Sequence, residues 1–376
     1  MMGKNLKIAL IHDFLLYQGG AEKVLEVLSE MFPEAPIYTL LYDKEKMRGK
    51  FADKEIKTSF LQKFPKFIRR RYKYLLLLMP TAPEMWDLRD FDLIISSSGA
   101  WSKGVVTRLD TVHISYLHSP LRFVWDANNE YLRGQKKRML VNFFVQIFLN
   151  YIRIWDRTAA DRPDYIIANS KYTQERIKKY YRRESAVIYP PVNISQSVIY
   201  KQQSKKSEGY FLVVSRLSPY KKIDKIVEAF NKLELSLVVI GEGSQEKYLR
   251  KIAGKNVKIL GWQSDEKISE YYAGACGFVF ASVDDFGITL VEAMAHGLPA
   301  VAIKKGGAIE IMIDGKTGEF FDEATPEVIA DGVRRMAEKL GSYDRDFIIN
   351  RTKEFSKEIF ARKFREYIEN IFKTKN

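Results

Sequence analysis

Three carboxylates surround a predicted helix start in the segment VDDFGITLVEAMAHGLPAVA, residues 283–302. Asp284 and Asp285 come just before Gly287, and Glu292 follows five residues after that glycine. The pattern predicts a strand that ends near 282 and a helix that starts near 288. The N–H groups of a helix's first turn have no acceptor within the helix and carry the positive end of its dipole. This helix start is therefore a predicted anion site, most naturally for a phosphate.

The backbone donors of this turn belong to Gly287, Ile288 and Thr289. A carboxylate one turn further into the helix, as Glu292 is, can accept hydrogen bonds from the hydroxyl pair of a ribose. Asp284, on the preceding loop, can bind a second polyol. A phosphate with a sugar on each side describes a nucleotide-sugar. The alternative for this segment alone is capping, in which an aspartate stabilises the helix dipole and Glu292 is a solvated helix position.

A second group of candidate residues lies in VVSRLSPYKKIDKIVEAF, residues 213–230. Arg216 comes just past a predicted strand, and Lys221 and Lys222 come at the start of the next helix. Arginine binds a diphosphate in bidentate fashion and lysine binds it as a point charge. Such cations stabilise the charge on a leaving diphosphate in place of a metal. In a basic chain, the same three cations also fit a solvated surface.

The chain has four histidines, of which His118 is the strongest candidate for chemistry. It stands at the carboxyl end of a predicted strand, where ligands bind in parallel sheets. His12, followed by Asp13, comes after the first predicted strand and is either a second cleft residue or part of the core. We expect His113 in the core or at a strand edge, and His296 in a capping role at a helix end.

Strand and helix patterns alternate in both halves of the chain, which predicts an α/β fold with parallel sheets covered by helices on both faces. Residues 194–208 are polar and lose the periodicity, which indicates a linker. We therefore expect two Rossmann-like domains, 1–193 and 209–355, with ligands bound in the cleft between them. A last amphipathic helix, 356–376, is expected to pack back on the N-terminal domain. The predicted strands are 7–14, 92–98, 112–119, 164–170, 185–193, 210–217, 235–243, 257–262, 276–282 and 299–305.

Composition excludes several classes of protein. The chain of 376 residues is 46% hydrophobic and 29% charged, as in globular proteins, and its single cysteine excludes an intramolecular disulfide. The amino-terminal pattern reads as a first strand rather than a signal peptide. The longest apolar run, residues 139–155, is interrupted by polar side chains and is not expected to span a membrane. The G-x-x-x-x-G-K-[ST] loop of nucleotidases does not occur.

The formal net charge of +14 favours anionic partners. Nucleic acid is not expected, because the aromatic residues form no recognisable stacking platform. A basic cluster interleaved with aromatic residues and followed by LLLLMP favours an anionic membrane surface, the alternative being a solvated face. Its members are Lys66, Arg69, Arg70, Arg71 and Lys73.

Three segments together resemble the donor domain of retaining glycosyltransferases of family 4, which have the GT-B fold: SRLSPYKKID, DDFGITLVEAMAHGLPAVA and GGAIEIMIDGKTGEFF. The family's hallmark is a carboxylate, seven residues and a glutamate, here Asp284 and Glu292, although the first position is normally glutamate. By this resemblance Arg216 and Lys221 match the diphosphate-binding pair, and Lys222 stands where many members have glycine. The turn of Phe286 and the three residues after it matches the sugar- and phosphate-contacting turn.

The N-terminal half is similar to the same family. LIHDFLLYQGGAEKV resembles its glycine loop, in which Gly19 and Gly20 let the backbone approach the diphosphate. YLHSPLRFVWD resembles mannosyltransferases of O-antigen and exopolysaccharide assembly, and within it His118 matches the active-site histidine, with Arg122 and Asp126 nearby.

The resemblance implies a retaining hexosyltransferase that moves mannose from GDP-mannose to a lipid-linked glycan. It implies a cytoplasmic enzyme held peripherally on the inner face of the cell membrane. No metal or other cofactor is expected, and the acidic pairs Asp90/Asp92 and Asp344/Asp346 are interpreted as structural. Three alternatives stay open: a transferase of the same fold that uses a UDP-sugar, a sugar-nucleotide epimerase or hydrolase, and a binding protein without catalysis.

Overall fold

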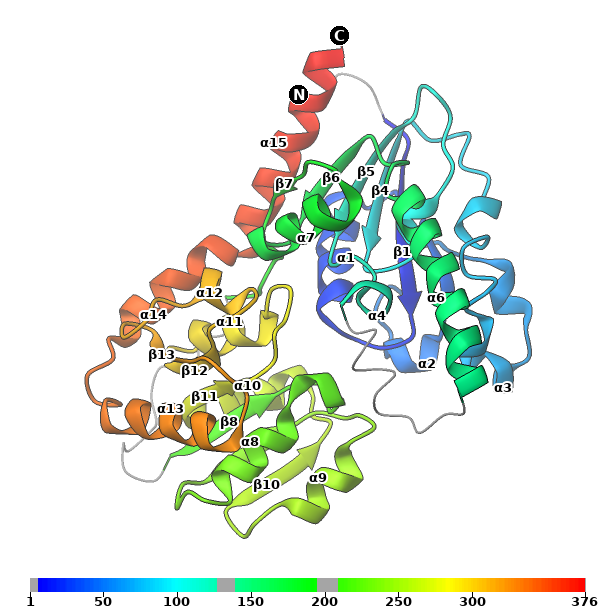
Figure 1. The fold of residues 1–376 in the computed structure, drawn as a ribbon. Coiled ribbons are helices and arrows are strands. Elements are labelled where there is room, and N and C mark those ends of the chain that lie inside the picture. Colours follow the sequence, from blue (N-terminus) through cyan, green and yellow to red (C-terminus); the bar gives the residue numbers. More distant parts are fainter. Residues whose placement is uncertain (1–5, 127–138, 195–208, 376) are drawn as a thin grey trace. The chain divides into compact units, whose positions relative to one another are not determined.

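The computed structural model describes residues 6–126, 139–194 and 209–375 and divides the chain into two compact units (Figure 1). The first comprises Met1–Tyr189 and Phe360–Asn376, and the second comprises Pro190–Ile359. Within the described residues each unit holds one sheet, of seven strands in the first and six in the second. All the strand pairs within the described residues are parallel. The prediction of two Rossmann-like α/β domains is confirmed.

The sheet of the first unit has the order β3-β2-β1-β4-β5-β6-β7. The chain adds β2 and β3 on one side of β1 and then returns to place β4 on the other side. The sheet therefore has its topological switch point between β1 and β4, where loops diverge at the carboxyl edge. The strands are β1 (Ile8–Leu15), β2 (Ile37–Tyr42), β3 (Ile56–Thr58), β4 (Leu93–Ser98), β5 (Val112–Leu117), β6 (Tyr165–Ala168) and β7 (Ala186–Val187).

Helices cover this sheet with apolar faces at the helical period. In α1 the buried residues include Val24, Leu25 and Leu28, which recur at i, i+1 and i+4. The α-helices of the first unit up to β7 are α1 (Gly20–Met31), α2 (Lys44–Met47), α3 (Lys66–Arg69), α4 (Arg122–Trp125), α6 (Met139–Ala159) and α7 (Lys171–Tyr181). Short 3₁₀ turns are η1 (Phe60–Lys63), η2 (Tyr72–Leu75), η3 (Pro83–Met85) and η4 (Ser102–Gly104).

The last helix, α15 (Lys357–Lys375), contributes to the core of the first unit. Phe360, Phe364 and Ile368 recur every four residues, so they share one face of the helix, and all three are buried. The ring of Phe360 contacts Tyr116 of β5, with the ring centroids 5.8 Å apart. Burying each large apolar side chain contributes about 1.5–3 kcal/mol, so this face ties the chain's last helix to the first sheet.

The sheet of the second unit has the order β10-β9-β8-β11-β12-β13 and repeats the same topology, with its switch point between β8 and β11. Its strands are β8 (Tyr210–Val214), β9 (Leu237–Ile240), β10 (Val257–Gly261), β11 (Ala275–Phe280), β12 (Ala300–Ile303) and β13 (Gly318–Phe321). Its helices are α8 (Ile223–Phe230), α9 (Glu246–Ile252), α10 (Asp265–Gly274), α11 (Ile288–Ala295), α12 (Ala308–Ile311), α13 (Pro326–Glu338) and α14 (Arg345–Thr352), with 3₁₀ turns η6 (Pro219–Lys221) and η7 (Lys353–Phe355).

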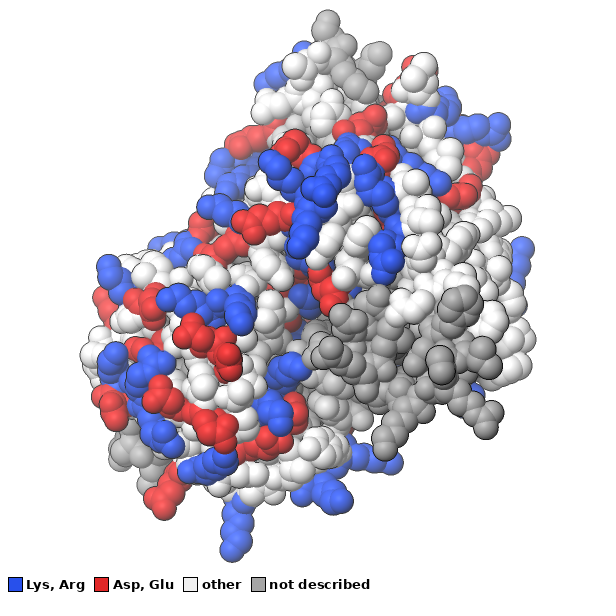
Figure 2. Space-filling model, viewed as in Figure 1, with Lys and Arg blue, Asp and Glu red and all other residues white. Residues whose placement is uncertain are grey.

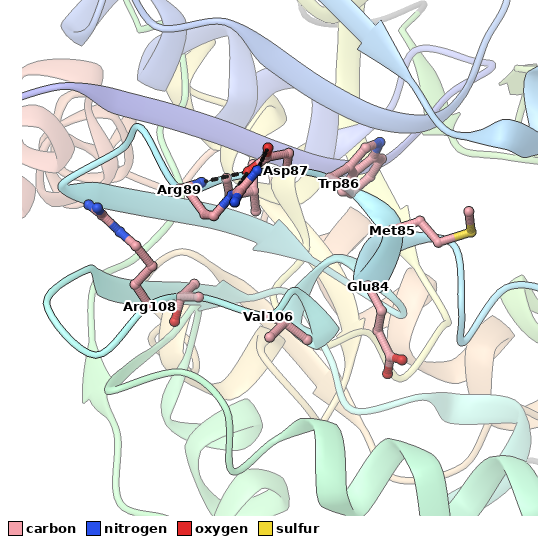
Figure 3. A pocket seen from close by; sticks show the side chains of 9 residues that line it. Glu84, Met85, Trp86, Asp87, Arg89, Val106 and Arg108 are labelled. Atoms are coloured by element: carbon pink, nitrogen blue, oxygen red, sulfur yellow. Dashed lines mark hydrogen bonds and ion pairs between the residues drawn. The ribbon is translucent and has the colours of Figure 1, made fainter.

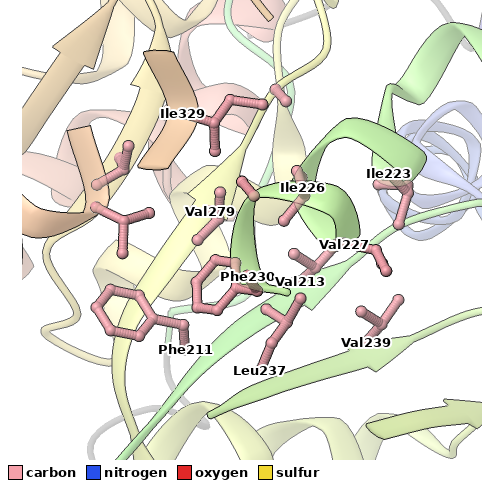
Figure 4. Packing of buried hydrophobic residues seen from close by; sticks show 14 of the residues in the cluster. Phe211, Val213, Ile223, Ile226, Val227, Phe230, Leu237, Val239, Val279 and Ile329 are labelled. Atoms are coloured by element: carbon pink, nitrogen blue, oxygen red, sulfur yellow. The ribbon is translucent and has the colours of Figure 1, made fainter. Parts of the chain in front are cut away.

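The core of the second unit forms where α8 packs on the central strands (Figure 4). Phe230 of α8 contacts Phe211 of β8 with ring centroids 5.4 Å apart, and both are buried. Ile329 of α13 belongs to the same cluster. This packing sets the positions at which β8 and β11 end, and the candidate site lies beyond those ends.

Some elements differ from the predictions. The segment 185–193 contains only the two-residue strand β7, and the predicted 210–217 strand ends at Val214. We predicted neither β2 nor β13, although β2 is a buried apolar run preceded by Pro36, which is a strand signal. Most of the predicted linker, 195–208, lies outside the described residues.

Candidate functional site

The second unit places its two predicted phosphate-binding segments at adjacent strand ends. β8 and β11 are neighbours in the sheet. Arg216 and Lys221 follow β8, whereas Asp284 and Gly287 follow β11. Because both strands are parallel, the two loops leave the same edge of the sheet, at its switch point.

Glycines shape the turn that starts α11. Gly287 is the N-cap and has φ 114°, a left-handed conformation that favours glycine. Gly307, from the next loop, packs against this turn: a Cβ there would lie 2.2 Å from the Phe286 carbonyl oxygen. The Gly307 N–H donates to the Asp284 carbonyl oxygen at 2.9 Å. The loop before α12 therefore braces the turn, and the first-turn N–H groups of Ile288 and Thr289 are held in place.

Phe286 anchors the turn by packing its side chain into the second unit. The residue is 3% exposed, and its ring meets Phe355 edge-on with the centroids 5.4 Å apart. A buried ring packs in the core rather than contacting a sugar, so the side chain of Phe286 supports the turn from within the second unit.

Lys221 and Asp284 form an ion pair between Nζ and Oδ2. Both side chains are only 15% exposed. We predicted that Lys221 binds a diphosphate and Asp284 binds sugar hydroxyls, as separate tasks; the structure brings the two groups into direct contact.

The two other predicted cations of this segment differ from Lys221. Arg216 lies exposed on the loop after β8. Lys222 is half-buried and has φ 55°, in the left-handed region. A non-glycine residue at positive φ carries backbone strain, whereas glycine would adopt this conformation without it.

Glu292 is half-buried on α11 and is positioned by an aromatic residue. The hydroxyl of Tyr272 donates to Glu292 Oε2 at 3.4 Å. Burial, together with the nearby carboxylate, raises the pKa of Tyr272 well above its usual range, so the phenol keeps its proton. Tyr272 also stacks on His296. The ring of His296 is hydrogen-bonded to the Glu292 carbonyl oxygen at 2.8 Å and to Ser269 Oγ at 2.9 Å, so His296 has a structural role at this helix end, as predicted.

In the first unit, His118 stands one residue past β5, as predicted, and is half-buried. It joins a chain of polar groups whose other members, Ser97, His12 and Glu22, are buried. Its Nε2 lies 2.8 Å from Ser97 Oγ, and Ser97 Oγ lies 3.1 Å from His12 Nδ1. His12 Nε2 in turn lies 3.5 Å from Glu22 Oε1. Burial, followed by the electrostatic effect of the neighbouring His12, lowers the pKa of His118 to about 3, so the ring is neutral at neutral pH. Sequence reasoning missed Ser97 and Glu22.

Asp13, left open between cleft and core, serves as a backbone anchor. Its carboxylate accepts the N–H groups of Gly99, Trp101 and Ser102 at 2.7–2.8 Å and so holds the loop after β4. Gly19 caps α1 in an extended conformation, φ −152°, which any residue adopts. The backbone conformation at position 19 therefore does not require glycine, and Gly20 is the first residue of α1.

The residues that follow His118 are fixed by ion pairing. Asp126 accepts from Arg176 Nη2 and from the Tyr180 hydroxyl. Arg176 Nη1 also donates to Ser119 Oγ at 2.8 Å, and Asn169 donates to the His118 carbonyl oxygen at 3.0 Å. Asp126 therefore supports the loop that carries His118.

Comparison with known families accounts for this arrangement. A model described as glycosyltransferase family 4 matches residues 18–196, and one described as glycosyl transferases group 1 matches residues 196–354. The two matches are consecutive and together span both units. The chain is a glycosyltransferase of the GT-B, family 4 type.

Relatives of this glycosyltransferase differ in what their names say they act on. An uncharacterised glycosyltransferase of Methanocaldococcus jannaschii is 23% identical over 87% of each chain. A GDP-mannose-dependent phosphatidylinositol monomannoside mannosyltransferase of Mycobacterium tuberculosis is 24% identical over 48% of this chain and 54% of its own. The crystal structure of Anabaena HepE with UDP superposes with a TM-score of 0.69 and 19% identity, covering 97% of this chain and 100% of that one. The last likeness shows the fold.

The first unit of the glycosyltransferase has a surface pocket that does not include His118 or its partners (Figure 3). Residues 84–89 and 106–108 line it, and these segments lead into β4 and β5. It therefore lies towards the amino ends of those strands, whereas His118 follows the carboxyl end of β5. Within it Arg89 pairs with Asp87 at 2.6 Å. We assign it no part in sugar transfer.

The two acidic pairs of the glycosyltransferase have structural contacts. Asp92 Oδ2 accepts the Lys7 N–H at 3.0 Å, before β4 begins. Asp344 caps α14 by accepting the Phe347 N–H at 3.0 Å. Among the described residues no group of three or more His, Cys, Asp or Glu side chains could hold a metal ion.

The predicted membrane-contact segment of the glycosyltransferase packs against α6. Leu61, Leu75 and Met79 share a buried cluster with Ile152 and Trp155 of α6. Around that cluster the segment exposes both cations and apolar groups: Lys66, Arg70 and Arg71, and with them Phe67, Tyr74 and Leu77. Arg69 is half-buried and donates to the Phe64 carbonyl oxygen at 2.9 Å. The side chain of Lys73 lies outside the described part.

One face of α6 is also apolar and exposed. Phe144, Ile147, Tyr151 and Ile154 recur at helical spacing, and all four are more than half exposed. By contrast, Figure 2 shows Lys and Arg interspersed with Asp and Glu over the second unit on the face drawn. Within the described residues, none of the helices combines the length and apolar character that crossing a bilayer requires.

Proposed function

We propose that this glycosyltransferase transfers mannose from GDP-mannose to a lipid-linked glycan, with retention of configuration, in cell-surface glycan assembly. The observation that carries the proposal is the contact of Lys221 with Asp284 beside the braced start of α11. It places a cation, a carboxylate and first-turn N–H donors together, which are the groups that a sugar diphosphate needs.

In this proposal the second unit binds the donor. Arg216, Lys221 and the N–H groups of residues 287–289 bind the diphosphate, and the carboxylate of Glu292 accepts from the ribose hydroxyls. Asp284 accepts from hydroxyls of the transferred sugar. Aspartate reaches about one methylene less far than the glutamate usual here, so the sugar must come closer to this loop.

The chemistry needs no protein nucleophile. The bond from the sugar's anomeric carbon to the diphosphate oxygen breaks, and the acceptor oxygen bonds to that carbon on the same face. The acceptor's proton passes to the departing diphosphate oxygen. Arg216 and Lys221 stabilise the charge that develops there, and no metal is required for that purpose. His118, being neutral, takes part as a hydrogen-bonding group of the first unit.

Support for mannose comes from the segment 116–126 and from the mycobacterial relative, whose name specifies GDP-mannose. A UDP-sugar is the second candidate, because the Anabaena structure holds UDP. A glucosyl or N-acetylglucosaminyl group would then be moved by the same residues.

The acceptor is proposed to be lipid-linked and reached from an anionic membrane surface. Support comes from the exposed cations and apolar side chains of residues 66–77 and from the exposed apolar face of α6. Basic side chains attract anionic lipid at about 1 kcal/mol each, and apolar side chains beside them enter the interface. The enzyme would then act peripherally at the inner face of the cell membrane.

The test is a transfer assay with purified protein, a lipid-linked glycan fraction and radiolabelled GDP-mannose, UDP-glucose or UDP-N-acetylglucosamine. The proposal predicts label in lipid from GDP-mannose alone, with the donor's anomeric configuration kept and no loss of activity in chelator. Label from a UDP-sugar alone would select the second candidate. Release or epimerisation of the sugar without acceptor would contradict transfer.

A further inference from the structure

Ser97 joins two imidazole rings on three neighbouring strands at the carboxyl edge of the first sheet. β4 lies between β1 and β5, and Ser97 pairs in register with His12 on one side and with Tyr116, two residues before His118, on the other. Its Oγ contacts His12 Nδ1 and His118 Nε2. His12 and Ser97 are strand positions, and His118 lies one residue past β5, where its N–H donates to the Ser98 carbonyl oxygen at 2.8 Å.

A single hydroxyl between two ring nitrogens restricts where the protons lie. Ser97 Oγ has one hydrogen to donate, so it can satisfy one bare ring nitrogen, and the other nitrogen must bring its own hydrogen. Two arrangements are therefore possible for neutral rings along the chain: the donors run from His118 towards His12, or from His12 towards His118.

Glu22 distinguishes the two directions. It lies in the first turn of α1, and an ionised carboxylate only accepts hydrogen bonds. Both Glu22 and His12 are buried, and they face each other at 3.5 Å. A hydrogen on His12 Nε2 gives this carboxylate a donor, whereas a bare Nε2 would set two acceptors against each other. A neutral His12 then has a bare Nδ1, which accepts from Ser97.

We propose that Ser97 is a positioning residue that holds His118 in the tautomer with hydrogen on Nε2, which leaves Nδ1 as an acceptor for a substrate hydroxyl. His118 Nε2 donates to Ser97 Oγ, Ser97 donates to His12 Nδ1, and the hydrogen on His12 Nε2 faces Glu22 Oε1 at 3.5 Å. No hydrogen bond joins His118 Nδ1 to another described residue. The role at a sugar hydroxyl rests on the proposed function; the tautomer does not.

The titratable groups that face His118 agree with a neutral ring. They are His12 and Asp13 of β1 and, through His12, Glu22 of α1. Asp13 favours a charged ring and His12 opposes it, while burial opposes it most. The carboxylate of Asp13 also accepts three backbone N–H groups, so it stabilises a charged His118 ring only weakly.

The chain offers a matched control one residue away. Ser96 Oγ lies 2.9 Å from His113 Nε2, in the same two strands, and both are buried. Neighbouring residues of a strand point to opposite faces of the sheet, so this pair repeats the contact without belonging to the chain of His118.

The first experiment is a long-range ¹H–¹⁵N correlation of ¹⁵N-histidine-labelled protein at pH 8, where ordinary imidazoles are neutral. It assigns the protonated nitrogen of each of the four rings by comparison with single histidine variants. We expect His118 to carry its hydrogen on Nε2. Hydrogen on Nδ1 of His118 would overturn the proposal, and this readout needs neither donor nor acceptor.

Variants then test the role of Ser97. Ser97→Ala should lose the tautomer preference and lower kcat/KM by roughly 10–100-fold, the usual cost of removing a group that orients a functional imidazole. Ser97→Thr keeps the hydroxyl and should restore the tautomer and most of the activity. Ser96→Ala should leave the His118 signals and the activity unchanged. A Ser97→Ala protein with the wild-type tautomer and turnover would contradict the proposal, and so would a Ser97→Thr protein that fails in both.

Failure of the proposed function has a different signature. If the enzyme moves another sugar, the tautomer and its dependence on Ser97 stay as stated, and the loss in Ser97→Ala appears with that sugar instead.

Discussion

Lys221 and Asp284 neutralise one another across the ends of β8 and β11. Both belong to the proposed donor site, so a diphosphate that binds Lys221 competes with Asp284 for the same cation. Once displaced, Asp284 has acceptors to offer to sugar hydroxyls. The pair therefore couples two events, binding of the diphosphate and recognition of the sugar, through a single contact.

Asp284→Asn separates these two events. The amide removes the competing negative charge from Lys221, so a nucleoside diphosphate without sugar should bind as tightly as to wild type, or up to about tenfold tighter. Transfer should fall, because the amide is a weaker acceptor for sugar hydroxyls. Calorimetry with the diphosphate, together with the transfer assay, measures both. Equal losses of nucleotide binding and transfer would count against the coupling.

Lys222→Gly tests whether the second lysine acts through its charge or only tolerates its backbone. Glycine removes the strain of φ 55° at Lys222, while it raises the entropy of the unfolded chain, so stability should change by no more than about 1 kcal/mol. Transfer should stay within about threefold of wild type. Urea denaturation and the transfer assay provide the measurements. A loss of transfer as large as that of Lys221→Ala would show that Lys222 belongs to the diphosphate site.

Several features were predictable because they depend on local pattern. The start of α11 was found from Gly287 and the carboxylates around it, and it lies at Ile288 as predicted. The position of His118 beyond β5 followed from the apolar run before it. These predictions need only strand and helix signals and the direction in which the chain leaves a strand.

Other features could not be predicted without knowledge of the order of the strands in each sheet. Lys221 and Asp284 are 63 residues apart and meet because β11 inserts beside β8. Ser97 was interpreted only as part of an apolar strand, since nothing in LIISSS indicates which serine lies between two histidines from strands 85 and 21 residues away. The sequence left open whether Asp13 reaches a cleft, and its three backbone partners show that it anchors the loop after β4.

Acid should destabilise the fold through buried histidines. Burial lowers the pKa of His113 to about 3 from its ordinary 6.5. Between those values the unfolded chain binds a proton that the folded chain refuses, so this contribution is complete above pH 6.5 and falls with acidification towards pH 3. The slope is up to about 1.4 kcal/mol per pH unit for each such group.

Urea denaturation between pH 7.5 and 4.5 measures how the free energy of unfolding changes with pH. In His113→Gln that slope should be smaller by about the contribution of one bound proton. The same direction holds for His118. Identical slopes in His113→Gln and wild type would refute the assignment to His113.

Membrane contact should depend on charge at one surface. Arg70 and Arg71 are exposed, and replacing both by glutamate should weaken binding to anionic vesicles by at least tenfold, since each basic residue contributes about 1 kcal/mol. Wild-type binding should decline with added salt. Lys247→Glu with Lys251→Glu changes the same number of exposed charges on α9 and should have little effect. Flotation of each protein with vesicles is the assay, and equal losses in both variants would indicate a nonspecific effect of net charge.

The most direct test of the donor site is thermal stabilisation of wild type and Lys221→Ala by GDP, UDP, ADP and dTDP. A ligand present at 100 times its dissociation constant adds about 2.7 kcal/mol, which shifts the melting temperature by several degrees. The account predicts such a shift for wild type, largest with GDP, and its loss in Lys221→Ala, with a fall in turnover that corresponds to roughly 2–4 kcal/mol. If no diphosphate stabilises wild type, or if Lys221→Ala responds as wild type does, the site at the start of α11 is not the donor site.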